Sequence, residues 1–402
     1  MARPARPFAL YRRPTKKAKE YIYHAKIRNP VTGRYDRTIS TGQTSRAYAE
    51  DWIRARLADE AIEAEQRARQ SEHVTLHDLA TDFWNPEGEY AESRRARGYS
   101  ISNGHLEISE SYTRNHIIPA WGSFRVGEIT AAQIDRWVLE LHRKGELSSS
   151  TINKLLQSLR SILDVAVRRG YIAANPASSV KPLRNVHRKR GVLTDDEVRR
   201  LLTWPGPFTD YRQYTINLLA FATGARIGEI RGLTIDHVHP DRVEIVQAWE
   251  EGHGLKPPKY GSIRAVPIST KVYEALTTVI EEHKPETLLF YGALGKDRPV
   301  SKSHIEQSLY RALAAMVLEE EDLKSKQKRE QALQPFIDRG VTFHSWRHKL
   351  NTILRSAGVP DAKIRLLTGH RGEHMTDWYT KFSADDYTDV LHVQTALLAA
   401  AS

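Results

Sequence analysis

The stretch between residues 148 and 170 most strongly constrains how this chain can fold. Its apolar side chains recur at the i, i+3, i+4 and i+7 spacing that collects them on one face of an α-helix. These residues are Ile152, Leu155, Leu156, Leu159, Ile162 and Leu163, and Gly170 follows as a typical helix end. Because such a helix is stable mainly through packing against neighbours, we expect a helical domain over residues 74–180. Further helix starts are expected at Thr75–Asp78 and Thr130–Gln133.

A different pattern precedes this domain. Residues 8–12, 20–28 and 34–40 are rich in Tyr, Ile and Phe, and turns that contain Pro or Gly separate them. Such segments are typical of short β-strands. From residue 44 to about residue 70 the pattern becomes helical. We predict a small N-terminal domain, residues 1–70, made of a three-stranded sheet and one helix.

The positive charge of the chain is concentrated at the same end. The 402 residues include 60 Lys and Arg against 49 Asp and Glu, which is a formal net charge of +11. Residues 1–50 hold 12 of the basic residues and only three of the acidic ones, so this segment carries +9 of the total. The asymmetry indicates a basic module with a polyanionic ligand of its own.

The residue types that the chain lacks exclude several classes of protein. It has no cysteine, which excludes a disulfide scaffold, a cysteine-ligated zinc or iron–sulfur centre and a cysteine nucleophile. No apolar run approaches the roughly 20 residues of a membrane span, and no apolar signal segment stands at the N-terminus. We expect an intracellular, cytoplasmic protein with no membrane partner.

A second large domain is expected after a basic linker. Residues 181–191 are basic and poor in helical pattern, and Thr194–Glu197 then form a capping-box pattern typical of a helix start. Most of residues 192–402 has helical periodicity, interrupted by the β-rich stretches 242–249 and 262–269. The sequence therefore predicts a multidomain fold that is mainly α with small β-sheets and ends in a mixed α+β domain.

Three shorter segments carry expectations of their own. Residues 85–106 are rich in Gly, Ser and Arg and are expected to be a loop, and the mixed charges of residues 317–330 predict a solvated helix. Apolar residues between 387 and 397 predict a C-terminal helix of about 15 residues. This helix packs either on its own domain or on a neighbouring protomer, and the sequence leaves both arrangements open.

Motifs for nucleotide or metal chemistry are weak. The string nearest to a phosphate-binding loop, residues 292–297, has the wrong spacing and lacks the hydroxyl residue, so we expect no use of ATP. His370 to His374 match the H-x-x-E-H pattern of a zinc-protease motif, which needs a continuous helix. Gly369 and Gly372 each weaken a helix by about 1 kcal/mol. We therefore expect no metal and no cofactor.

Six polar residues stand in four other motifs. Taken alone each motif has an ordinary interpretation, such as a surface ion pair between Arg226 and Glu229. The motifs are T-G-x-R-x-x-E at residues 223–229, a turn lysine eight residues before Pro267, H-x-x-R at 344–347, and G-H followed by a tyrosine nine residues later. Their candidate site residues are Arg226, Lys259, His344, Arg347, His370 and Tyr379. Together the motifs make the chain resemble the tyrosine recombinase (phage integrase) family over about residues 75–395.

The types of these six residues fit the cutting and rejoining of a DNA strand. Cutting and rejoining a DNA strand without ATP requires the bond energy to be stored, and a phosphotyrosine ester stores it. Tyr379 is the candidate nucleophile. Charge that develops on the phosphate oxygens suits bidentate contacts from Arg226 and Arg347, whose guanidinium groups stay charged.

The roles of the other three residues are implied by the resemblance. Lys259 would protonate the leaving 5′-oxygen, His344 would act in an acid–base relay, and His370 would hydrogen-bond the phosphate. The chain departs from the family pattern at Trp346, where an aliphatic residue is common, and at Thr368, where leucine is usual. We expect both departures to be changes in packing.

The resemblance implies an integrase of a phage or another mobile element. It would consist of an arm-binding domain (1–70), a helical core-binding domain (74–180) and a catalytic domain (192–402). Its implied partners are double-stranded DNA at a core crossover site and at separate arm sites, the other copies of a homotetramer, and accessory DNA-bending proteins, all at the nucleoid. Alternatives are a chromosome-dimer resolvase, which normally lacks the N-terminal module, a type IB topoisomerase, and a DNA-binding regulator without catalysis.

Overall fold

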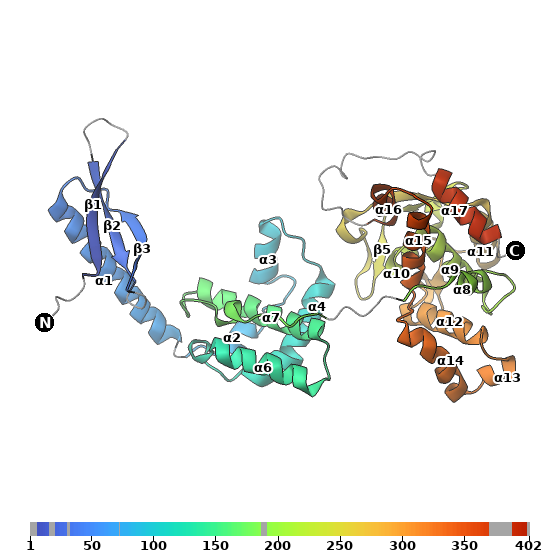
Figure 1. Cartoon of the computed structure of the whole chain (residues 1–402), viewed down its shortest axis with the longest axis horizontal. Coiled ribbons are helices and arrows are strands. Elements are labelled where there is room, and N and C mark those ends of the chain that lie inside the picture. Colours follow the sequence, from blue (N-terminus) through green and yellow to red (C-terminus); the bar gives the residue numbers. More distant parts are fainter. Residues whose placement is uncertain are drawn as a thin grey trace. The chain divides into compact units, whose positions relative to one another are not determined.

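The computed structural model describes residues 6–15, 21–29, 33–71, 73–185, 191–369 and 388–399, apart from the side chains of residues 63–71, 260 and 397–399. The chain divides into two compact units, Met1–Val186 and His187–Ser402, and each is described by itself (Figure 1). The division falls inside the linker expected at residues 181–191. The further division of the first unit into two domains stays a prediction.

The first unit begins with a three-stranded antiparallel sheet. Its strands are β1 (Phe8–Pro14), β2 (Tyr21–Arg28) and β3 (Tyr35–Ser40), in the order β1-β2-β3. The helix α1 (Arg46–Ser71) follows the sheet in the sequence and packs against β1 and β2. The predicted sheet and helix are therefore confirmed, with small shifts at their ends.

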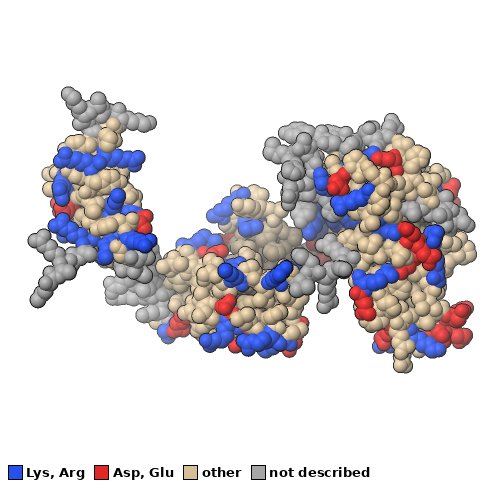
Figure 2. Space-filling view, viewed as in Figure 1, with Lys and Arg blue, Asp and Glu red and all other residues tan. Residues whose placement is uncertain are grey.

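The two faces of this sheet differ because side chains alternate along each strand. Phe8 and Ala25 lie on the face toward α1, where they form a small buried core with Ile53. Tyr11 and Lys26 lie on the opposite face, and the Lys26 ammonium is 5.5 Å from the centroid of the Tyr11 ring. Lys and Arg side chains are frequent on the surface of this part (Figure 2).

The rest of the first unit is helical. Its helices are α2 (Leu76–Ala80), α3 (Glu89–Ala96), α4 (Asn103–Tyr112), α5 (Ile118–Trp121), α6 (Ala131–Lys144) and α7 (Ser149–Arg168), with a π-helical turn η1 (Thr113–Ile117) and 3-10 turns η2 (Val126–Glu128) and η3 (Pro176–Ser179). Helix α7 is the helix predicted from the apolar spacing, and its six predicted apolar residues are all buried. The capping boxes expected at Thr75 and Thr130 are both present.

The prediction of a loop over residues 85–106 is wrong. Helix α3 and the start of α4 occupy much of this segment. Each helix buries an apolar side chain completely, Ala91 in α3 and Leu106 in α4, and the Ser102 hydroxyl accepts a hydrogen bond that caps α4. The polar residues of this segment lie on exposed helix faces. The composition was misleading because tertiary packing, more than intrinsic propensity, decides whether short helices form.

The second unit contains the remaining elements that the structure describes. Its helices are α8 (Asp195–Leu201), α9 (Tyr211–Thr223), α10 (Ile227–Arg231), α11 (Thr270–His283), α12 (Lys302–Ala315), α13 (Glu320–Leu323), α14 (Lys326–Asp338), α15 (Ser345–Ser356), α16 (Asp361–Thr368) and α17 (Thr388–Ala399), with 3-10 turns η4 (Ile235–His237) and η5 (Lys259–Gly261). Its strands are β4 (Arg242–Ile245), β5 (Ala248–Glu250), β6 (Gly254–Lys256), β7 (Arg264–Pro267), β8 (Tyr291–Gly292) and β9 (Gly295–Pro299). The capping box expected at Thr194 begins α8.

Two expectations for this unit need correction. The β-rich stretches do pair, as β4 with β7, but an additional hairpin of β5 and β6 lies between them in the sequence. The single helix expected over residues 317–330 is instead two helices, α13 and α14. They are separate because the Ser325 side chain accepts the Lys328 backbone N–H and starts α14 anew.

Helix α9 lies at the centre of the second unit. Every residue from Gln213 to Thr223 is buried, and both α11 and α15 pack against this helix. The indole N–H of Trp346 on α15 donates a 2.8 Å hydrogen bond to Oδ1 of Asn217 on α9. Thr368 is also buried, and its hydroxyl donates to the Ile364 carbonyl at 2.7 Å. Both departures from the family pattern are therefore changes in packing.

The C-terminal helix α17 packs on the second unit of its own chain. Val390 is buried, and Nε2 of Gln394 donates hydrogen bonds to the carbonyls of Ala222 (2.8 Å) and Pro267 (3.3 Å). The helix thus closes over the end of α9 and the end of β7. Within the described ranges, no helix combines the length and the apolar character needed to cross a membrane.

The Trp346 hydrogen bond generates a test of this core. Trp346→Phe leaves the buried Asn217 oxygen without its indole donor, and we expect the free energy of unfolding to fall by about 1–3 kcal/mol from this loss alone. The measurement is urea unfolding of the full chain, followed by circular dichroism. The matched control is Trp249→Phe, because the Trp249 indole N–H has no hydrogen-bond partner among the described residues. Equal losses in the two variants would contradict the assignment.

Candidate active site

The candidate site is built around the buried carboxylate of Glu229. Arg226 precedes α10 as its N-cap, and its backbone N–H and Nη1 donate to the two oxygens of Glu229 at 2.9 and 2.8 Å. Nη2 of Arg264, on β7, donates to Oε2 of Glu229 at 2.7 Å. The Glu229 side chain is only 1% exposed. Since the carboxylate lies inside the unit, a surface ion pair is not the correct interpretation of this motif.

The helix at this motif starts later than the sequence suggested. The apolar spacing of Ile227, Ile230 and Leu233 predicts a helix from about residue 224. Helix α10 instead begins at Ile227, and Arg226 has extended backbone angles. This difference matters because an N-cap residue leaves its backbone N–H free to bond a carboxylate three residues on. The late start therefore lets Arg226 hold Glu229 with both its backbone and its side chain.

The ionisation of Glu229 reflects two opposing effects. Burial acts to raise the pKa of the carboxyl group, because it removes the charged form from water. The charges and hydrogen bonds of Arg264 and Arg226 outweigh burial and hold the pKa below its ordinary value. Glu229 is therefore ionised at neutral pH.

Arg347 adds a third guanidinium group to the same cluster. It lies on α15, is 1% exposed, and donates from Nη1 to the Gly224 carbonyl at 2.7 Å. Burial, followed by the positive charges of Arg226 and Arg264, lowers the pKa of Arg347 to about 9. Three arginines against one glutamate leave an excess of positive charge, which suits a phosphate group.

Two glycines let the surrounding chain approach these arginines. Gly224 and Gly369 have φ angles of +61° and +66°, which favour glycine. A Cβ on Gly369 would lie 2.7 Å from Nη1 of Arg264 and 2.9 Å from the Ser262 hydroxyl. The Gly369 carbonyl accepts a 3.1 Å hydrogen bond from Nη2 of Arg226. Arg226 thus holds the turn at Gly369, and the turn lies close against Arg264.

The remaining candidate residues differ in how the structure places them. His344 is the residue before α15, one helical turn from Arg347, and its ring meets that of His348 edge to face at 4.8 Å. Lys259 begins the short turn η5 that precedes β7, the strand of Arg264. His370 and Tyr379 lie outside the described residues, and so does the rest of the H-x-x-E-H pattern. Within the described ranges, no group of His, Asp and Glu residues could hold a metal ion.

Arg264 was missed in the sequence. It lies two residues before Val266 on β7, and side chains two apart on a strand share a face. Val266 is fully buried, so Arg264 is an arginine at an inward position of a strand. That pattern was visible in the sequence, but nothing local showed that a carboxylate would meet it.

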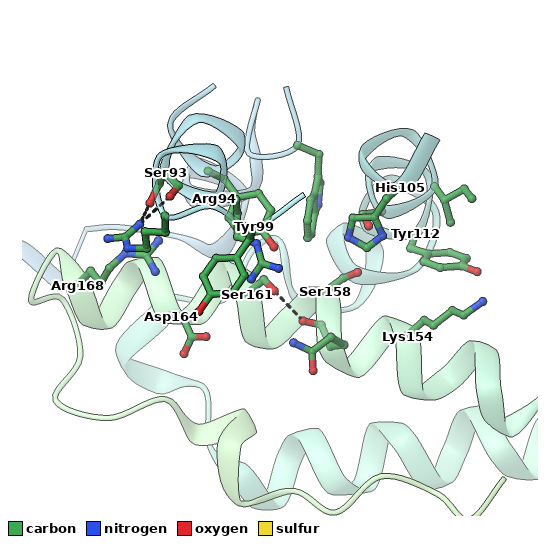
Figure 3. A pocket seen from close by; sticks show the side chains of 16 residues that line it. Ser93, Arg94, Tyr99, His105, Tyr112, Lys154, Ser158, Ser161, Asp164 and Arg168 are labelled. Carbon is green, nitrogen blue, oxygen red and sulfur yellow. Dashed lines mark hydrogen bonds between the residues drawn. The ribbon is translucent and has the colours of Figure 1, made fainter. Parts of the chain in front are cut away.

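The first unit contains a second candidate site, a cleft of about 650 Å³ among α3, α4 and α7. Arg94 and Tyr99 lie over α7 (Figure 3), with the Arg94 guanidinium 4.7 Å from the centroid of the Tyr99 ring. Burial, and then the charge of Arg94, lowers the pKa of His105 in the same cleft. Lys154 on α7 adds a further cation. Basic and aromatic side chains of this kind suit the phosphates and bases of a nucleic acid.

Two sequence families match this chain. Residues 191–385 match the phage integrase family, and residues 87–182 match the phage integrase central domain. The tyrosine recombinase XerD of Staphylococcus aureus (strain Mu50) is 26% identical over 245 residues, which is 59% of this chain and 73% of XerD. The chain belongs to the phage integrase family and is a tyrosine site-specific recombinase.

Solved structures show the same fold. The Tn1549 transposon integrase in complex with transposon right end DNA is similar over 81% of this chain and 100% of its own, with 21% identity and a TM-score of 0.57. A lambda integrase tetramer bound to a Holliday junction is similar over 94% of this chain and 97% of its own, with 18% identity and a TM-score of 0.54. The expected fold class, mainly helical with small sheets, is confirmed.

The buried Glu229 carboxylate generates a prediction about pH. Its pKa is lower in the folded chain than the ordinary 4.5, so the unfolded chain binds more protons as the pH falls below that value. The stability due to Glu229 is therefore fully present above about pH 4.5 and is lost as the pH falls through the lower, folded pKa. Glu229→Gln should lower the free energy of unfolding by about 3–5 kcal/mol at pH 7.

The measurement is urea unfolding of both proteins between pH 7 and about pH 3. The difference between them should shrink as the pH falls, because the wild type loses what the variant lacks already. Glu251→Gln is the control, since Glu251 also pairs with an arginine, at 2.8 Å, but is 81% exposed. A difference between wild type and Glu229→Gln that stays constant with pH would show that the carboxylate charge is not what stabilises the site.

Proposed function

We propose that this recombinase cuts one DNA strand by attack of the Tyr379 hydroxyl on a phosphodiester. The bond from phosphorus to the 5′-oxygen breaks, a 3′-phosphotyrosine forms, and a free 5′-hydroxyl leaves. The ester conserves the energy of the phosphodiester, so attack by a 5′-hydroxyl can rejoin a strand without ATP. The observation that carries the proposal is the cluster of Arg226, Arg264 and Arg347 around one buried carboxylate.

In this proposal Arg226 and Arg347 bind the non-bridging oxygens of the phosphate. These oxygens gain negative charge in the transition state, and fixed positive groups stabilise that charge most where water is excluded. Arg347 suits the role because it is buried beside two other cations, so a bound phosphate relieves an existing repulsion. Glu229 would hold the arginines in place and would not accept a proton, because its pKa is kept low.

Protons must move at both ends of the reacting phosphate. An alkoxide is a poor leaving group, and we assign Lys259 as the acid that protonates the leaving 5′-oxygen. His344 takes part in the transfer of the Tyr379 proton, and His370, directly after the Gly369 turn, hydrogen-bonds the phosphate. General acid–base catalysis of this kind typically contributes 10²- to 10⁴-fold in rate.

We further assign the chain to a mobile element, as an integrase acting at the nucleoid, rather than to chromosome-dimer resolution. A resolvase normally lacks an N-terminal module, whereas here a folded sheet and helix precede the helical part. The fold likeness to lambda integrase covers 94% of the chain and so extends into this module. By analogy with that structure, four copies would act together on DNA. The resemblance to integrases adds a DNA-bending protein as a further proposed partner.

The two surfaces of the first unit would bind different DNA segments. The cleft of Arg94, His105 and Lys154 is the candidate contact to the core crossover site. The outer sheet face with Tyr11 and Lys26 is the candidate contact to a separate arm site. A β-sheet can read base edges in a groove, while a basic tail can only neutralise phosphates.

The nucleophile is tested by Tyr379→Phe, which removes only the hydroxyl. On a nicked duplex that traps the cleaved strand, the wild type should form a covalent protein–DNA adduct through a 3′-phosphate. The variant should bind this DNA with unchanged affinity and form no adduct. An adduct with Tyr379→Phe would move the assignment to another tyrosine, with Tyr387 next. A wild type that binds but never forms an adduct would favour a regulator without catalysis.

The arm contact is tested by Lys26→Ala in the full chain. The expected result is a loss of about 1–3 kcal/mol in preference for attachment-site arm DNA over random duplex, at about 0.15 M salt. The control is Arg37→Ala, which removes the same charge from the opposite face, where Arg37 pairs with Glu60 of α1 at 3.0 Å. Equal effects of the two substitutions would reduce the module to a non-specific basic patch. Strand cleavage at the core site should persist in both variants.

A further inference from the structure

Arg264 contacts three separate segments that carry candidate catalytic residues. Nη2 donates to Glu229 at 2.7 Å and Nη1 reaches the other Glu229 oxygen at 3.4 Å, so the guanidinium lies against the carboxylate that also holds Arg226. Nε donates to the Leu367 carbonyl at 2.8 Å, two residues before the Gly369 turn. Nη1 also donates to the Ser262 carbonyl at 3.1 Å.

The contact to Ser262 reaches the segment of Lys259. The loop of residues 257–263 joins β6 to β7 and contains Lys259, and we call it the Lys259 loop. Within it, the Ser262 hydroxyl donates to the Lys259 carbonyl at 3.0 Å. A chain of contacts therefore runs from Glu229 through Arg264 and Ser262 to the backbone of Lys259. The loop is anchored at its two ends by β6 and β7, but strand pairing does not hold residues 257–263 themselves.

The surroundings of Arg264 leave little freedom for this residue. Its side chain is 7% exposed, and the Gly369 turn approaches it so closely that a Cβ would lie 2.7 Å from Nη1. A planar group with five donors can serve a carboxylate and two backbone carbonyls at once, whereas a lysine ammonium cannot reproduce that fork. The site therefore requires arginine and not simply a positive charge.

We propose that Arg264 is a positioning residue that holds the Lys259 loop in register with the arginine cluster, so that Lys259 meets the leaving 5′-oxygen. The inference rests on the proposed function, because it takes Lys259 as the acid. Arg264 itself does not touch the reacting atoms in this proposal. Misplacement of a catalytic group by about 1 Å can cost 10²-fold in rate, and that is the effect expected when Arg264 is replaced.

The test uses a leaving group that needs no acid. In a nicked core-site duplex, sulfur replaces the 5′-bridging oxygen of the scissile phosphate. Cleavage then breaks the bond from phosphorus to sulfur and releases a thiolate, which is stable because thiols ionise near pH 8.5 and alcohols far above that. A protein whose only defect is a misplaced or missing acid should cleave the sulfur substrate at close to the wild-type rate.

We expect Arg264→Lys to cleave ordinary DNA about 10- to 10²-fold more slowly than the wild type in single turnover. On the sulfur substrate its rate should return to within about threefold of the wild-type rate. Ser262→Ala, which removes only the hydroxyl contact within the Lys259 loop, should show a smaller loss that sulfur also restores. Arg242→Lys is the matched control: Arg242 lies on β4, paired with β7, with its ion pairs at the surface, and this variant should match the wild type on both substrates.

Two results would overturn the inference. One is an equal loss for Arg264→Lys on both substrates, which would mean that Arg264 supports the fold or the arginine cluster in general. The other is a wild-type rate for Arg264→Lys on ordinary DNA. Lys259→Ala, run in parallel, separates this inference from the proposed function. If sulfur restores Lys259→Ala but not Arg264→Lys, only the inference fails. If sulfur does not restore Lys259→Ala, the assignment of Lys259 as the acid fails.

Discussion

The carboxylate of Glu229 lies buried between the guanidinium groups of Arg226 and Arg264, and the geometry of the candidate site depends on this contact. A buried charge is costly unless its hydrogen-bonding capacity is filled. Here the backbone N–H of Arg226 and three guanidinium nitrogens fill it. Arg226 stands directly before α10 and Arg264 lies on β7, so the carboxylate that pairs with both arginines also joins these two segments.

Positive charge remains in the candidate site after this pairing. Arg347 is buried beside Arg226 and Arg264, and its burial, followed by the charges of these two arginines, lowers the pKa of Arg347. In the proposed function an anionic phosphate would relieve the repulsion among the three cations. In the proposed function these groups would need little reorganisation when charge develops on the phosphate, which is how preorganised sites lower a barrier.

The first unit presents two surfaces of different chemistry. The sheet uses one face for its small core with α1 and leaves Tyr11 and Lys26 on the other, as the alternation of a strand requires. The helical part instead forms a cleft, which is lined by Arg94 of α3, His105 of α4 and Lys154 of α7. Two surfaces of this kind would suit the proposed binding of more than one stretch of DNA.

Local sequence patterns determined the helix α7, the three N-terminal strands, the capping boxes and the motifs of the candidate site, because spacing, caps and turn residues act over a few residues. They did not determine that residues 85–106 fold, which depends on pockets that receive Ala91 and Leu106. Nor did they show the contact of Arg264 with Glu229, or that of Arg226 with Gly369, 143 residues away. Only the tertiary structure decides such contacts, because it brings residues that are distant in the sequence together and buries their charges. A buried charge is costly unless a partner charge and hydrogen bonds compensate it.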